Sequence, residues 1–152
     1  MGDGIGVIGQ TIQLALAPVF VLVAIGNIMN ILSTRLGRIV DRSRWLQQRH
    51  GETFGSDHDI IVIEMRASDD RIALITKAIR NLVISGLSIG TTVAVLFAEE
   101  MAGYPLEKLA AVFFILAIAL LMWALLLFLR ETRVAAATLR IPRDYLELHR
   151  DL

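Results

Sequence analysis

Three long apolar segments dominate this sequence and limit the chain to folds that a membrane can hold. They cover residues 5–32, 81–98 and 109–129, and the last contains no charged residue. A helix of about 20 apolar residues crosses the roughly 30 Å hydrocarbon core of a bilayer. The 55% share of hydrophobic residues and a mean hydropathy of +0.62 agree with such segments. We therefore predict an all-α protein with three transmembrane helices, organised as a single membrane domain over residues 1–152.

Positive charge is restricted to two of the regions outside these spans. Residues 33–80 and 130–152 hold fourteen of the fifteen Lys and Arg residues, and the short link 99–108 holds only Lys108. Basic residues are retained on the cytoplasmic side during membrane insertion. We therefore expect the N-terminus to lie outside and the C-terminus to lie in the cytoplasm.

The region between the first two spans has the pattern of a helical hairpin. Apolar residues recur at helical spacing after the first span, at Leu36, Ile39 and Leu46, and a Gly-rich polar turn follows at residues 51–57. We predict that residues 33–80 form an antiparallel cytoplasmic stalk, with Arg42 level with Asp70 and Asp41 level with Arg71. A helix lying flat on lipid phosphates is the alternative.

The other connections are shorter. Gly103 and Pro105 predict a tight outer turn at residues 99–108, between the second and third spans. The tail 130–152 is expected to continue as a C-terminal cytoplasmic helix.

Polar residues in the second span share one helix face. At about 100° per residue, their spacing places them in one stripe that ends at the outer mouth. The members of this stripe are candidate pore-lining residues: Asn81, Ser85, Ser88, Thr92 and Glu99. The alternative is that the hydroxyl groups only bond back to their own helix.

Small residues and amides predict helix contacts. A neighbouring face of the second span carries Gly or Ala at every fourth position, which allows close helix approach in lipid. Amides of the first span are expected to bond to another helix. The helix-packing candidates are Gly86, Gly90, Ala94, Ala98, Asn27 and Asn30.

A basic segment follows the first span. Its residues are candidates for binding anionic lipid or a cytoplasmic protein partner: Arg35, Arg38, Asp41, Arg42 and Arg44. The sequence shows no catalytic constellation and contains no cysteine. We expect no enzymatic activity, no cofactor, no metal site and no nucleic-acid partner.

The run LAPVFVLVAIGNIMNILSTRLGRIVDRSR at residues 16–44, and RLGRIVDR within it, carries a resemblance. It resembles an uncharacterised family of bacterial three-span membrane proteins, domain of unknown function 2721. The resemblance implies a location in the bacterial inner membrane and three helices, and it implies no reaction, ligand or site residue.

Two functions remain open from the sequence. Three short helices enclose little volume, so we expect a homo-oligomer surrounded by membrane lipid. In one hypothesis this oligomer forms a cation pore lined by the second span, because Glu99 and Glu100 lie at its outer mouth. In the other, the protein is a non-conducting scaffold or accessory subunit that acts through its basic stalk.

Overall fold

The computed structural model describes the backbone of residues 3–138 and the side chains of residues 16–136. This part of the chain forms three α-helices: α1 (Asp3–His50), α2 (Ser56–Ala102) and α3 (Glu107–Thr138). Each helix is long and apolar enough to cross a membrane. The all-α prediction with three candidate spans is therefore confirmed. The predicted tail beyond residue 138 lies outside the described residues.

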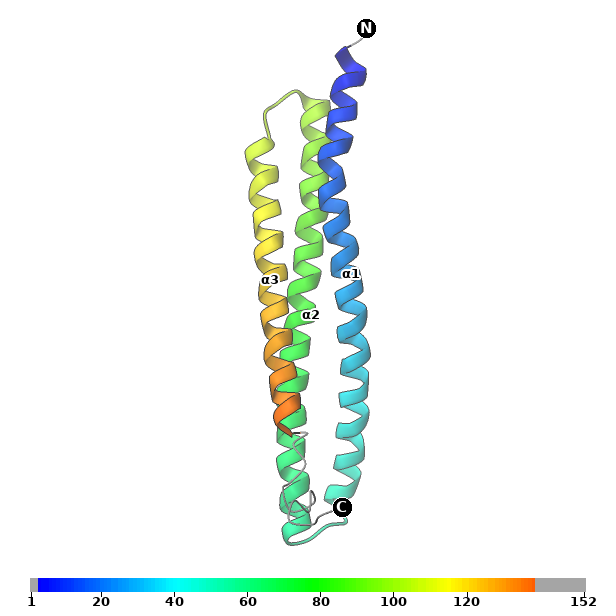
Figure 1. The fold of residues 1–152 in the computed structure, drawn as a ribbon, viewed down its shortest axis with the longest axis vertical. Helices are drawn as coiled ribbons and strands as arrows, with labels where there is room; N and C mark the ends of the chain where they lie inside the picture. The colour runs from blue at the N-terminus through cyan, green and yellow to red at the C-terminus, as the bar shows by residue number, and fades with distance from the viewer. Residues whose placement is uncertain (1–2, 139–152) are drawn as a thin grey trace, which may run out of the picture.

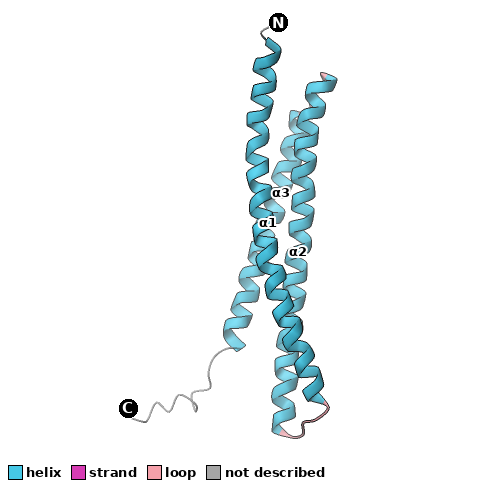
Figure 2. Ribbon diagram, turned by 90° about the vertical axis from the view of Figure 1, so that its right-hand side faces the viewer, coloured by secondary structure: helices cyan, strands magenta, loops and turns pink. Residues whose placement is uncertain are grey.

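Helix α2 lies between the other two helices and packs against both. Figure 1 shows α1 and α3 on opposite sides of α2, with the α1–α2 turn at one end and the α2–α3 turn at the other. In the view turned by 90° (Figure 2), α1 crosses α2. Contacts between α1 and α3 are few by comparison.

Glycines set both ends of α2. Gly55 precedes the helix with φ of 66°, and Gly103 follows it with φ of 67°. This left-handed conformation favours glycine, which has no Cβ. The Gly103 N–H donates to the Glu99 carbonyl at 2.9 Å, which caps the helix end. The chain turns between α1 and α2 at residues 51–55 and between α2 and α3 at residues 103–106.

Most buried residues of the three helices recur every seven positions. On α1 they are Ile25, Leu32, Ile39 and Leu46; on α2 they are Ile61, Ser68, Ile75, Leu82 and Ile89; on α3 they are Ala110, Ala117, Ala124 and Glu131. A second series on α2 consists of Ala78, Ser85 and Thr92. A seven-residue spacing keeps the same side of a helix against its neighbour and is typical of left-handed helix packing.

The two helix contacts differ in the size of their side chains. Large aliphatic residues, such as Leu32 and Ile75, fill the contact between α1 and α2. Small residues, such as Ala117 and Ala124, are buried on α3 where it packs against α2. Small side chains allow two helix backbones to approach closely in a membrane. Helix α3 therefore packs against α2 through small side chains, whereas α1 packs against α2 through larger side chains.

The register of the hairpin differs from the prediction. Arg42 pairs with Glu64, not with Asp70, and Arg71 pairs with Glu131, not with Asp41. The prediction was wrong because it counted from the apparent ends of the spans. The turn instead sets the register. In sequence, residue 53 lies midway between Arg42 and its partner Glu64. It also lies midway between Arg35 and Arg71, which both pair with Glu131.

Candidate functional site

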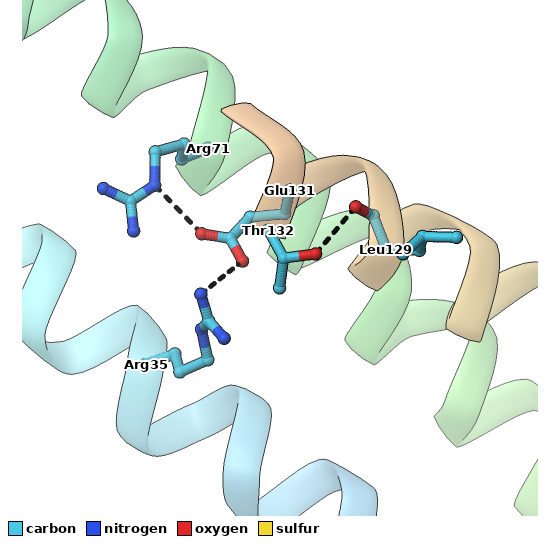
Figure 3. Close-up of polar contacts among 5 residues, drawn as sticks. All are labelled: Arg35, Arg71, Leu129, Glu131 and Thr132. Atoms are coloured by element: carbon cyan, nitrogen blue, oxygen red, sulfur yellow. Dashed lines mark hydrogen bonds and ion pairs between the residues drawn. The ribbon is translucent and has the colours of Figure 1, made fainter. Parts of the chain in front are cut away.

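A carboxylate buried between three helices forms the centre of the candidate site. Glu131 of α3 has a fully buried side chain (0% exposed). Its Oε1 accepts a hydrogen bond from Arg71 Nε of α2 at 2.9 Å, and its Oε2 lies 3.0 Å from Arg35 Nη2 of α1. Figure 3 shows Arg35 and Arg71 reaching Glu131 from two helices. One residue thus links all three helices.

The position of Glu131 follows from the seven-residue pattern of α3. The buried positions before it hold Ala110, Ala117 and Ala124, and Glu131 occupies the next. A carboxylate at such a position is costly to bury unless it is paired. The two guanidinium groups supply this pairing, and Arg35 also lies over the Phe128 ring, with its Cζ 5.1 Å from the ring centre.

A cavity of about 660 Å³ opens beside this ion cluster. Its polar lining consists of Arg35, Arg38, Arg42, Glu64, Ser68 and Arg71. Its apolar lining consists of Ile39, Ala67 and Ala135. We call this space the arginine cavity.

Positive charge exceeds negative charge around the arginine cavity. Four guanidinium groups line it, and the carboxylates that pair with them are those of Glu64 and Glu131. Four positive charges against two negative charges leave an excess of two. The arginine cavity therefore suits an anion.

Arg42 is held at the rim of the cavity by a bidentate pair. Its Nε and Nη2 donate to the two carboxylate oxygens of Glu64 at 2.7 and 2.9 Å. These hydrogen bonds raise the pKa of Arg42 above its ordinary value, and the attraction to Glu64 adds to them while partial desolvation opposes them. The side chain also stacks on Trp45, with Cζ 4.2 Å from the ring centre. Arg42 is therefore charged and fixed in position.

The middle of the predicted polar stripe is buried within the protomer. Ser85 donates a hydrogen bond across to the Ala117 carbonyl of α3 at 2.7 Å. Ser88 and Thr92 donate to the carbonyls of Ile84 and Ser88 of their own helix. These hydroxyl groups already have protein acceptors. The two ends of the stripe, Asn81 and Glu99, are half-buried.

The helix-packing candidates fall into two groups. Gly86 lies against α1, since a Cβ at this position would be 3.6 Å from Leu22 Cδ1. Gly90, Ala94 and Ala98 are exposed on the protomer. Asn27 and Asn30 are exposed as well, so α1 carries two amide side chains on its outer surface.

The candidate residues of the basic segment also fall into two groups. Arg35, Arg38 and Arg42 line the arginine cavity, whereas Asp41 and Arg44 are exposed and lie outside its lining. Arg71 and Glu131 belong to the site but were not among the sequence candidates. The signal for Glu131 was the heptad Ala110, Ala117, Ala124, Glu131, in which a carboxylate follows three small residues.

The hairpin turn brings two histidine rings together without forming a metal site. The ring centres of His50 and His58 are 4.4 Å apart. Within the described part of the chain, no group of three His, Asp or Glu side chains is arranged to hold a metal ion.

The chain matches the family model described as "Protein of unknown function (DUF2721)" over residues 15–141. The match covers most of the sequence, and the chain belongs to this family. Searches of curated proteins and of solved structures found no match. The molecule is thus a small protein of the DUF2721 family with three candidate membrane helices.

Proposed function

We propose that the protein is a non-enzymatic, non-conducting membrane scaffold whose basic hairpin faces the cytoplasm and binds anionic phospholipid. The observation that carries this proposal is the arginine cavity, where Arg35, Arg38, Arg42 and Arg71 surround one space. Anionic headgroups on the cytoplasmic leaflet attract such clusters of basic residues. The protein partner predicted for the same segment remains an alternative occupant.

The helix register supports an upright hairpin. Leu32 ends the apolar part of α1, and Leu129 ends the apolar part of α3. In the register that the ion pairs of Glu131 define, both residues lie level with residues 73–74 of α2. A cytoplasmic membrane boundary at this level leaves the hairpin turn about 30 Å beyond it, at 1.5 Å per residue. Packing between α1 and α2 continues to Leu46 and Ile61, which favours a stalk over two separate helices on the lipid surface.

This boundary gives Lys77 and Arg80 a defined role. Both are exposed, and they lie about 4.5 and 9 Å on the membrane side of residue 74 along α2. Long basic side chains reach from such depths to the lipid headgroups while their methylene groups stay in hydrocarbon. Lys77 and Arg80 would therefore anchor α2 at the cytoplasmic leaflet.

We also propose a homo-oligomer, and α1 carries the support for it. Asn27 and Asn30 lie on the membrane side of Leu32, and both are exposed on the protomer. An amide facing hydrocarbon without a partner is unfavourable, and a second helix is its usual partner. Native mass spectrometry of the solubilised protein tests this, and Asn27→Leu with Asn30→Leu should lower the oligomer fraction.

A cation pore lined by α2 is the second candidate function. Glu99 and Glu100 at the outer end of α2 support it. The hydroxyl groups of Ser85, Ser88 and Thr92 weigh against it, because they bond to carbonyls of the same protomer. Cation flux into proteoliposomes that is lost in Ser88→Leu and Glu99→Gln would favour the pore over the scaffold.

The proposed lipid function is tested by the phospholipids that copurify with the protein in mild detergent. We expect the ratio of anionic to zwitterionic phospholipid to exceed that of the source membrane. Charge reversal at Arg38 and Arg44 should lower the ratio towards the membrane value. A ratio that equals the membrane value in the unaltered protein would contradict the proposal.

A further inference from the structure

We propose that the arginine cavity is a specific binding site for one phosphate group, held chiefly by Arg38, Arg35 and Arg71. This inference rests on the proposed function and deepens it, because it replaces a general attraction to anionic lipid with one site per protomer. The phosphate group can belong to a phospholipid headgroup or to free phosphate.

The guanidinium groups around the cavity have donors left over. Arg35 uses Nη2 and Arg71 uses Nε for Glu131. A guanidinium carries five N–H donors in a planar fork, so both retain several. Arg38 lines the cavity, is exposed, and forms no ion pair with another described residue. Phosphate oxygens match the fork of arginine in both charge and spacing.

Glu131 orients two of these donor groups. It is fully buried, and it holds Arg35 and Arg71 from opposite sides of one carboxylate. Groups that are fixed before a ligand arrives lose less conformational entropy on binding. Glu131 is thus a positioning residue, and Arg38 is the residue that the ligand itself would fix.

The charge of the cavity agrees with a phosphate ligand. The four arginines and the two carboxylates leave two positive charges unmatched. A phosphomonoester carries a charge of about −1.5 to −2 at pH 7, and a phosphodiester carries about −1. Either anion reduces the excess without reversing it.

The depth of the cavity favours a lipid source. Arg35 and Arg38 follow Leu32 by three and six residues, which corresponds to about 4.5 and 9 Å along α1. The headgroup layer extends about 5–8 Å beyond the hydrocarbon core on each side. With the boundary at Leu32, Arg35 lies at the level of the headgroup layer and Arg38 lies at its outer edge.

The test uses the full chain in mild detergent after removal of native lipid. Native mass spectrometry measures binding of phosphatidylglycerol and of phosphatidylcholine, and thermal unfolding measures stabilisation by inorganic phosphate. Arg38→Gln removes a guanidinium that forms no ion pair with another described residue, and Arg38→Lys retains the charge without the fork. Arg66→Gln is the matched control, because Arg66 is exposed and lies outside the cavity lining.

We expect one phosphatidylglycerol per protomer and weaker binding of phosphatidylcholine. Arg38→Gln should weaken phosphatidylglycerol binding by about tenfold, the size of one charge-assisted hydrogen bond. Arg38→Lys should cause a smaller loss, and Arg66→Gln should cause little. Stabilisation by inorganic phosphate that depends on Arg38, without lipid preference, would support the site and identify free phosphate as its source.

Two results would overturn the inference, and only one of them would also contradict the proposed function. Equal losses in Arg38→Gln and Arg66→Gln would mean that only the overall surface charge attracts lipid, which leaves the proposed function intact. An absence of preference for any phosphate anion would remove both the site and the proposed function. The melting temperature of each variant without ligand shows whether the fold is retained.

Discussion

Glu131 is the polar residue through which ion pairs join all three helices of the described chain. It is fully buried, and its two oxygens are shared between Arg35 of α1 and Arg71 of α2. By contrast, the Arg42–Glu64 pair is partly exposed, with 49% and 37% of its side chains accessible. Burial decides the difference, because loss of one partner from the buried cluster leaves charge uncompensated, whereas water screens the exposed pair.

Replacing Glu131 should therefore destabilise the protein strongly. Glu131→Gln leaves two guanidinium groups without their carboxylate, and we expect a loss of about 3–5 kcal/mol. Glu64→Gln removes the exposed pair and should cost less than about 1 kcal/mol. Thermal unfolding in detergent checks both variants, and similar losses for the two would contradict the structural role of Glu131.

The heptad of α3 points to Glu131, but the sequence did not show that this residue is buried at the centre of the ion cluster. It follows Arg130 directly after an apolar run, where a carboxylate suggests a solvated tail. Its burial depends on the rotation of α3 and on the register of all three helices, which no local pattern specifies. The same reason explains the error at Arg42, whose partner is set by a turn eleven residues away.

Each helix forms as the sequence predicts, because its signals are local. The lengths of the apolar runs and Gly103 account for the helices and for the turn between α2 and α3. Three members of the predicted polar stripe of α2, Ser85, Ser88 and Thr92, are buried. Which helix covers that face is a tertiary property, and the structure assigns Ser85 to α3 through the Ala117 carbonyl.

The close contact between α2 and α3 should tolerate no larger residue at its centre. Ala117 is 0% exposed and lies beside Ser85, so Ala117→Leu should overpack the contact and cost about 1–3 kcal/mol. Ala119→Leu is the matched control, since Ala119 is exposed on the same helix. Melting temperatures should fall only for Ala117→Leu; an equal fall for both would argue against this helix contact.

At the scale of the whole molecule, the proposed topology gives the two turns different environments. The outer turn follows α2 at Gly103, and the hairpin turn precedes it at Gly55. The chain contains no cysteine, so a single introduced thiol reports only its own position.

Thiol labelling in intact cells checks that topology. Met101→Cys is expected to react with a membrane-impermeant maleimide, because Met101 is 90% exposed beside the outer turn. Ser56→Cys, beside the hairpin turn, should react only after the cells are permeabilised. The opposite pattern would reverse the orientation of the protein and place the arginine cavity on the outer leaflet.

The three-helix ion cluster also has a consequence for biogenesis. A ribosome delivers Arg35 and Arg71 long before it delivers Glu131, which lies 60 residues after Arg71. Until the third helix is inserted, the nascent hairpin exposes two arginines whose carboxylate has not yet been made. A chain that stalls or is truncated before Glu131 therefore keeps two arginines without the carboxylate that pairs with both of them in the finished protein.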